Sequence, residues 1–294
     1  MNLAELLRPF SPPQTNFVDR LRYWKDAKAN DLALRFLQDG EHKEVVLTFA
    51  RLDERARAIG AKLTSMNMRG QRALLLYQSG LDFVEAFMGC HYAAVVPVPA
   101  FPPRRNRNMG RIDAISRDAQ AALALTTNDV LERIDRATLS DSPSLQRASW
   151  IATDLVPSEL ASDWVHPRLN SDDIALIQYT SGSTGTPKGV VLTQYNVMSN
   201  CKMISEAFQV LTDDHAISWL PLYHDMGLIG GIINPLFMGC SVTLMSPLAM
   251  LTRPIRWLQA VSNFRARITG GPNFAYSLCV ERITDEMCEG LDLS

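Results

Sequence analysis

The loop Tyr179–Gly189 is rich in glycine and in residues with hydroxyl side chains, and its residue types could bind a ligand or take part in catalysis. It reads Tyr-Thr-Ser-Gly-Ser-Thr-Gly-Thr-Pro-Lys-Gly, with five hydroxyl residues and two glycines between Thr180 and Thr186. Glycines let backbone N–H groups approach an anion closely, and the hydroxyls add hydrogen-bond donors. Lys188 adds a mobile positive charge. This combination indicates a polyphosphate ligand.

The loop differs from a Walker A motif. That motif ends in Gly-Lys followed by Ser or Thr and opens directly into a helix. Here Lys188 lies between Pro187 and Gly189, and a short apolar strand over residues 190–193 follows, as in a hairpin. The alternative interpretation is a flexible surface turn. Such turns are common, but a lysine between proline and glycine with strands on both sides is not, which favours the phosphate-binding function.

Alternating helix-like and strand-like segments must position this loop, and they predict an α/β fold with largely parallel sheets. We expect strands over residues 72–77, 94–99, 122–127, 174–180, 190–193, 216–220, 241–245 and 266–270. We expect helices over residues 52–66, 80–92, 111–121, 196–208, 226–238 and 273–287, and one that Thr252 caps and that has Pro254 in its first turn. The prolines of residues 94–99 favour a sheet edge for that strand.

A stretch rich in Pro, Ser and Asp, residues 140–171, predicts an irregular linker. We therefore expect a first α/β subdomain over residues 1–170 and a second over residues 171–294 that carries the loop. In each of them helices should sandwich the sheet.

Composition limits the functional classes. The chain has 294 residues, 29 Lys+Arg against 31 Asp+Glu, and 47% hydrophobic residues, which indicates a globular protein without the positive field of a nucleic-acid binder. Five scattered cysteines without a CxxC pair predict reduced thiols in the cytoplasm, and the five histidines form no metal motif. Residues 226–252 carry no charge and could span a bilayer, but their glycines and prolines favour buried elements over a membrane span.

The segment Thr180–Val190 resembles the phosphate-binding loop of the adenylate-forming superfamily, which comprises acyl-CoA synthetases, firefly luciferase and the adenylation domains of nonribosomal peptide synthetases. Residues 74–104, 218–240 and 244–279 are most similar to the fatty-acyl-AMP ligase branch. The resemblance extends from Phe49 to the end of the sequence.

This resemblance implies that a fatty-acid carboxylate attacks the α-phosphate of ATP, giving an acyl-adenylate and pyrophosphate. The acyl group then passes to the phosphopantetheine thiol of an acyl carrier protein. Because an anion attacks a polyanion, catalysis would depend on Mg²⁺ and positive donors. By motif match, the residues that would hold the β- and γ-phosphates are Thr180, Ser181, Gly182, Ser183, Thr184, Gly185 and the catalytic Lys188.

His224 is the second predicted catalytic residue. It matches a family position beside the acyl-adenylate carbonyl, and the alternative interpretation is a satisfied core histidine. Its neighbour Asp225 is expected to cap the helix at Met226, and a pair with His224 is not implied, because adjacent side chains on helices and strands point in different directions. The residues expected to contact substrate are His224, Met226, Gly227, Ile232, Gly270, Gly271 and Pro272, although simple core packing is the alternative for the apolar ones.

Family members continue with segments that stack on adenine, hold Mg²⁺ and bind the ribose, and then with a C-terminal lid domain. None of these is found in the 294 residues, so we expect an incomplete active site, no metal ligand and no lid domain. Two other functions stay open. One is a fatty-acyl-CoA synthetase with CoA as acceptor, and the other is a non-catalytic module that binds acyl chains or a partner.

Overall fold

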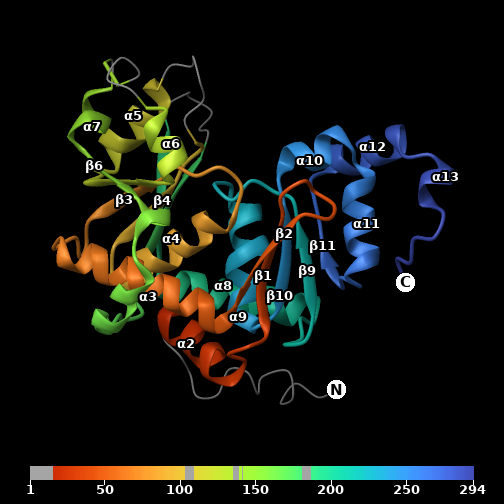
Figure 1. The fold of residues 1–294 in the computed structure, drawn as a ribbon, viewed down its shortest axis with the longest axis horizontal. Helices are drawn as coiled ribbons and strands as arrows, with labels where there is room; N and C mark the ends of the chain where they lie inside the picture. The colour runs from red at the N-terminus through yellow and green to blue at the C-terminus, as the bar shows by residue number, and fades with distance from the viewer. Residues whose placement is uncertain (1–15, 103–108, 135–138, 141, 181–186) are drawn as a thin grey trace.

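The computed structural model describes residues 16–102, 109–134, 139–140, 142–180 and 187–294. The described chain is a mixed α/β fold with two largely parallel sheets flanked by helices, which confirms the predicted fold class (Figure 1). A two-stranded antiparallel hairpin forms a third group of strands. Within these described residues, no helix is both long and apolar enough to cross a membrane.

The first sheet is parallel and contains, in spatial order, β4 (Val96–Pro99), β3 (Arg72–Leu75), β5 (Leu123–Thr126) and β6 (Ser149–Ala152). The helices that pack on it are α3 (Phe49–Ser65), α4 (Leu81–Tyr92) and α5 (Gly110–Asp118). Ala73 and Leu75 share a core with α3 and α4, whereas Leu74 shares one with α5. Both faces are therefore covered, which explains the continuous apolar runs. As its prolines predicted, β4 is an edge strand.

The second sheet contains, in spatial order, β11 (Ile268–Thr269), β9 (His215–Ser218), β10 (Ser241–Met245), β1 (Leu32–Leu37) and β2 (Glu44–Thr48). All neighbours are parallel except the β1–β2 pair. The early strand β1 pairs with β10, from more than 200 residues later in the chain, with Leu34 opposite Val242. The sequence analysis did not predict β1 and β2, and the boundary near residue 170 stays a prediction.

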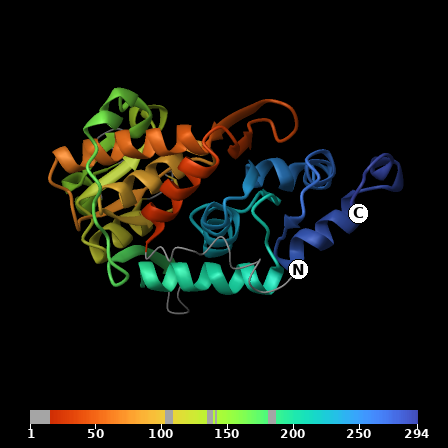
Figure 2. The ribbon, with the colours of Figure 1, turned by 90° about the horizontal axis from the view of Figure 1, so that it is seen from below.

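Helices also cover both faces of the second sheet. One face packs against η4 (Met226–Ile233), which is a stretch of π-helix, and α9 (Asn234–Met238). The opposite face packs against α11 (Ile255–Asn263) and α12 (Asn273–Arg282). Figure 2 shows α8 (Gln194–Phe208) running along the outside of the molecule toward α12.

Residues 140–171 differ from the predicted irregular linker. They contain α7 (Pro143–Arg147), β6, and the short helices η2 (Thr153–Leu155) and η3 (Ser158–Asp163). Only a four-residue strand enters the sheet, which is too short for its periodicity to be recognised. The guanidinium of Arg55 holds this stretch by donating to the carbonyl oxygens of Thr153 (3.0 Å) and Val156 (2.8 Å).

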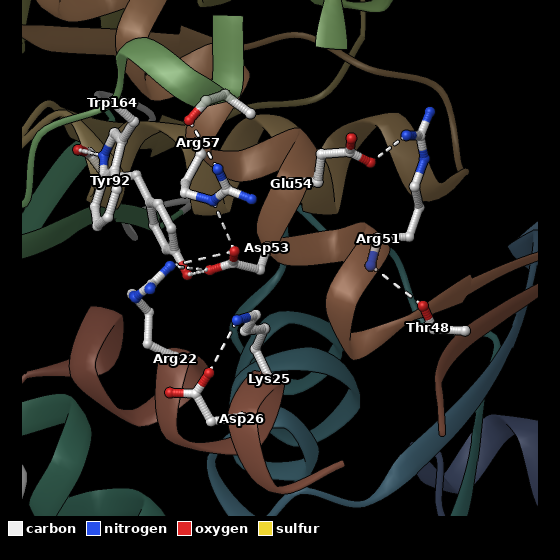
Figure 3. Close-up of polar contacts among 11 residues, drawn as sticks. Arg22, Lys25, Asp26, Thr48, Arg51, Asp53, Glu54, Arg57, Tyr92 and Trp164 are labelled. Atoms are coloured by element: carbon white, nitrogen blue, oxygen red, sulfur yellow. Dashed lines mark hydrogen bonds and ion pairs between the residues drawn. The ribbon is translucent and has the colours of Figure 1, made fainter. Parts of the chain in front are cut away.

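A buried carboxylate joins the same stretch to the helices (Figure 3). Asp53 of α3 is fully buried and accepts hydrogen bonds from Arg22 of α2 (Phe17–Ala27) at 3.0 Å, from Arg57 at 2.8 Å and from the Tyr92 hydroxyl at 2.8 Å. Arg57 also donates to the carbonyl oxygen of Ala161 at 2.7 Å. The cluster therefore connects α2, α3, α4 and η3.

Three helices near the end of the chain have other boundaries than predicted. Residues 226–238 are continuous, but they begin as the π-helix η4 and end as α9. Thr252 does not cap α11, because it ends the separate helix α10 (Pro247–Thr252), and Pro254 precedes α11. The final predicted helix divides into α12 and α13 (Asp285–Cys288).

Candidate active site

The predicted phosphate loop connects the two strands of a hairpin, as the sequence indicated. Strand β7 (Ile174–Thr180) pairs antiparallel with β8 (Lys188–Thr193), and Thr180 lies opposite Lys188 at the open end. Both residues are exposed. The other predicted phosphate ligands lie outside the described residues: Ser181, Gly182, Ser183, Thr184 and Gly185.

Contacts on both sides position this hairpin. The amide nitrogen of Gln178 donates to the carbonyl oxygen of Tyr223 at 3.0 Å, and the Tyr179 hydroxyl donates to Asp118 at the end of α5. Burial and the neighbouring Asp118 carboxylate raise the pKa of Tyr179, which therefore stays a neutral donor. At the base, Thr193 and Asn196 form a capping box that begins α8. The loop thus extends from a hairpin anchored to α5, α8 and residue 223.

His224 lies in a turn that follows β9. Its backbone N–H donates to the carbonyl oxygen of Pro221 at 3.1 Å, and its own carbonyl accepts from Leu228 at 2.8 Å. Asp225 accepts from the backbone N–H of Met226 at 2.7 Å, which confirms the predicted helix cap.

The sequence did not imply a pair between His224 and Asp225, but the structure brings their side chains together. Nδ1 of His224 lies 2.6 Å from Oδ1 of Asp225, and both side chains are about two-thirds exposed. Adjacent side chains point in different directions in regular helix or strand geometry, whereas His224 lies in a turn where adjacent side chains can face the same side.

Two of the predicted residues line one cavity of about 560 Å³. Thr180 at the end of β7 and His224 in the turn face it together. Its apolar wall comes from the end of β4 and the two residues after it, and from α5 and the residue before it, through Pro99, Ala100, Phe101, Met109, Ile112 and Ile115. The cavity is also lined by Arg111, Gln178, Tyr179, Tyr223 and Asp225. The sequence analysis missed the apolar wall, although the apolar spacing of α5 indicated a buried face there.

A second cavity of about 460 Å³ lies beneath η4 and contains three predicted residues, Met226, Gly270 and Gly271. Its other walls come from β9, β11, α12 and α8 through residues including Ser218, Thr269, Tyr276, Ile204 and Phe208. The sequence analysis did not identify these residues. The i, i+4 spacing of Ile204 and Phe208 was the available signal for the wall from α8.

The three other predicted substrate contacts occupy different positions. Gly227 is buried, and a Cβ built there would lie 2.3 Å from the carbonyl oxygen of Pro221, so glycine allows η4 to approach the turn. Ile232 is fully buried in the main core and lines neither of these two cavities. Pro272 caps the start of α12. For Ile232 the structure corresponds to the core alternative, because its side of the helix faces the sheet.

Comparison with known proteins identifies the family. The profile of the family described as AMP-binding enzyme matches residues 21–291, and the chain belongs to this family. The medium-chain fatty acid–acyl-carrier-protein ligase JamA of Moorena producens (strain JHB) is 43% identical over 286 residues, which cover 96% of this chain and 48% of JamA. The corresponding ligase TtuA of Teredinibacter turnerae is 31% identical, over 94% of this chain and 49% of TtuA.

Solved structures agree with these relatives. The fatty acyl-adenylate ligase from L. pneumophila, crystallised with acyl adenylate and pyrophosphate, superimposes with a TM-score of 0.89 at 35% identity. The match covers 99% of this chain and 49% of that one. The chain therefore spans about half the length of the relatives it matches.

Proposed function

We propose that this chain contributes the phosphate-binding and acyl-binding part of a ligase that activates a fatty acid as its acyl-adenylate, with release of pyrophosphate from ATP. The observation that carries the proposal is the position of the turn after β9. This turn lies between the two cavities, because His224 and Asp225 line the first and Leu220 and Met226 line the second. A carboxyl group at this turn would have hydrogen-bond donors for phosphate on one side and an apolar cavity on the other.

Each polar residue has a distinct task in this proposal. Thr180 and the loop 181–185 would donate hydrogen bonds to the β- and γ-phosphates, and Lys188 across the hairpin would supply positive charge to them. The Asp225 carboxylate lies 2.6 Å from Nδ1 of His224, so in this proposal Nδ1 carries the proton and Nε2 would face the reacting carboxyl group. These groups neutralise and orient anions, which is the main requirement of phosphoryl chemistry.

The described residues do not form a metal centre. They contain no group of three or more His, Cys, Asp or Glu side chains placed to hold a cation. ATP-dependent ligation of this kind implies Mg²⁺, for which the described residues offer no such cluster of ligands. We therefore derive no step through the metal.

The acceptor we propose is the thiol of an acyl carrier protein. JamA and TtuA, both named as ligases that act with such a carrier, support this choice over CoA. We also propose a cytoplasmic location, supported by the five cysteines, which are all unpaired.

Calorimetric titration of the chain with ATP and with dodecanoate tests the two binding functions separately. We expect both ligands to bind, and binding of neither would refute the proposal. Fatty-acid-dependent exchange of labelled pyrophosphate into ATP, measured on the protein in which this sequence occurs, tests adenylate formation. Supplying carrier protein or CoA to the loaded enzyme then decides the acceptor, and preferential transfer to CoA would favour the acyl-CoA synthetase alternative.

A further inference from the structure

The cavity beneath η4 has two ends, which different elements form. One end lies at the carboxyl ends of β9 and β11, where Ser218, Thr269 and Gly270 line it close to the turn that carries His224. The other end lies at α8 and is formed by Ile204, Phe208 and Val210, with Arg267, which donates to the carbonyl oxygen of Gln209 at 3.2 Å, beside them. An acyl chain whose carboxyl group lies at the turn would therefore extend along β9 toward α8.

Residues of η4 and α9 mark positions along this path. Met226 lies at the first end, since a Cβ built on Gly270 would be 4.0 Å from its methyl carbon. Asn234 lies at the α8 end, because its amide donates to the carbonyl oxygen of Cys201 at 3.0 Å and to the Ser205 hydroxyl at 2.9 Å. Gly230 lines the cavity and is four residues from each of them, so it occupies the middle of the path.

The two adjacent glycines at this midpoint have different surroundings. A Cβ built on Gly231 would lie 2.7 Å from Oγ and 3.1 Å from Cβ of Ser218, so Gly231 allows the helix to contact β9. A Cβ built on Gly230 would meet no atom within 4 Å. Gly231 therefore serves packing, whereas Gly230 is exposed where it lines the cavity, and a side chain there would enter open space.

We propose that Gly230 determines the length of the acyl chain that this cavity accommodates. The inference rests on the proposed acyl-binding function and adds the residue that sets its specificity. A side chain at this position would block the cavity at its midpoint, so the methylene groups of a longer acyl chain could not be buried beyond residue 230. Chains that end before residue 230 would bind as before.

The size of the effect follows from burial of methylene groups. Each one transferred from water is worth about 0.8 kcal/mol, which is about fourfold in affinity. Exclusion of three methylenes should thus weaken binding by about fiftyfold. Because affinity is lost only for the methylenes that are excluded, the loss must increase with the length of the fatty acid.

The test measures dissociation constants of octanoate, dodecanoate and hexadecanoate by calorimetry, below their micelle concentrations, for the wild-type chain and for Gly230→Leu. We expect the leucine variant to retain octanoate affinity and to bind hexadecanoate at least about tenfold more weakly. Gly230→Ala is the matched control and should bind all three like the wild type. Gly231→Ala should lower the melting temperature and weaken all three acids together.

Each outcome is informative. If the wild-type chain binds none of the acids, the proposed acyl-binding function fails. If the wild type binds them and Gly230→Leu, folded by circular dichroism, weakens all three equally or none, the assignment of Gly230 is overturned while acyl binding stands.

Discussion

Replacing Asp53 by asparagine should destabilise the protein strongly, although this residue lies in neither cavity. Its carboxylate is fully buried and accepts hydrogen bonds from Arg22, Arg57 and Tyr92 at 2.8 to 3.0 Å. Asparagine has the shape of aspartate, but it removes the negative charge and turns an NH₂ group toward side chains that themselves donate hydrogen bonds. Two guanidinium groups would then face each other without the anion between them.

The magnitude follows from the exposure of the partners. Removing one member of a buried ion pair typically costs about 3–5 kcal/mol. The Arg22 and Arg57 side chains are 31% and 25% exposed, so water relieves part of this penalty. We therefore expect a loss near the lower limit, about 3 kcal/mol, which for a chain of this size lowers the melting temperature by roughly 6 °C.

Thermal and urea unfolding, followed by circular dichroism, measure this loss. The matched control is Asp26→Asn, because Asp26 pairs with Lys25 at 2.9 Å but is 68% exposed. A surface pair of this kind contributes less than about 1 kcal/mol. Limited proteolysis adds a local readout, since Arg57 also holds the Ala161 carbonyl and cleavage of residues 153–164 should accelerate. Equal stability of the Asp53→Asn and Asp26→Asn variants would refute the reasoning.

Three further predictions concern charge, pH and close packing. Lys188→Ala should weaken ATP binding about tenfold to a hundredfold, the equivalent of one charge-assisted hydrogen bond, and unchanged affinity in calorimetry would contradict the phosphate-loop assignment. Burial lowers the pKa of His91 to about 4. In the unfolded chain this imidazole binds its proton near pH 6.5, so the free energy of unfolding should fall by up to about 3 kcal/mol as the pH is lowered from 6.5 to 4. Urea unfolding at several pH values measures this fall. A His91→Phe variant whose free energy of unfolding falls as steeply with pH would contradict the prediction. Gly227→Ala places a Cβ 2.3 Å from the Pro221 carbonyl oxygen and should cost about 1–3 kcal/mol in thermal unfolding, whereas Gly230→Ala should cost nothing.

Local sequence patterns were sufficient for much of the fold. The strand over residues 241–245 has the predicted limits, and the β7–β8 hairpin follows from two apolar runs around a loop of glycine and hydroxyl residues. These features depend on residues close together in the chain, where spacing, glycine and proline act directly on the backbone.

Other features depend on contacts between distant residues. Strand β1 contains Arg35 among its apolar residues, and β2 is exposed over Glu44–Val46, so neither has a clear periodicity. Both form because β10 provides a parallel partner for β1. The apolar spacing of residues 226–238 fits an α-helix as well as a π-helix, and the close approaches of Gly227 to Pro221 and of Gly231 to Ser218 accompany the π-helical turn.

The sequence by itself determined the family resemblance, the alternation of helices and strands, and the chemistry of the loop that ends at Lys188. Only the tertiary structure decided which of the predicted substrate residues reach a cavity: His224, Met226, Gly270 and Gly271 do, while Ile232 is buried in the core. It also paired His224 with Asp225 and distinguished Gly230 from Gly231. The reason is physical. Residue type and spacing specify the face of a helix, whereas the surroundings of each side chain depend on elements that pack from elsewhere in the chain.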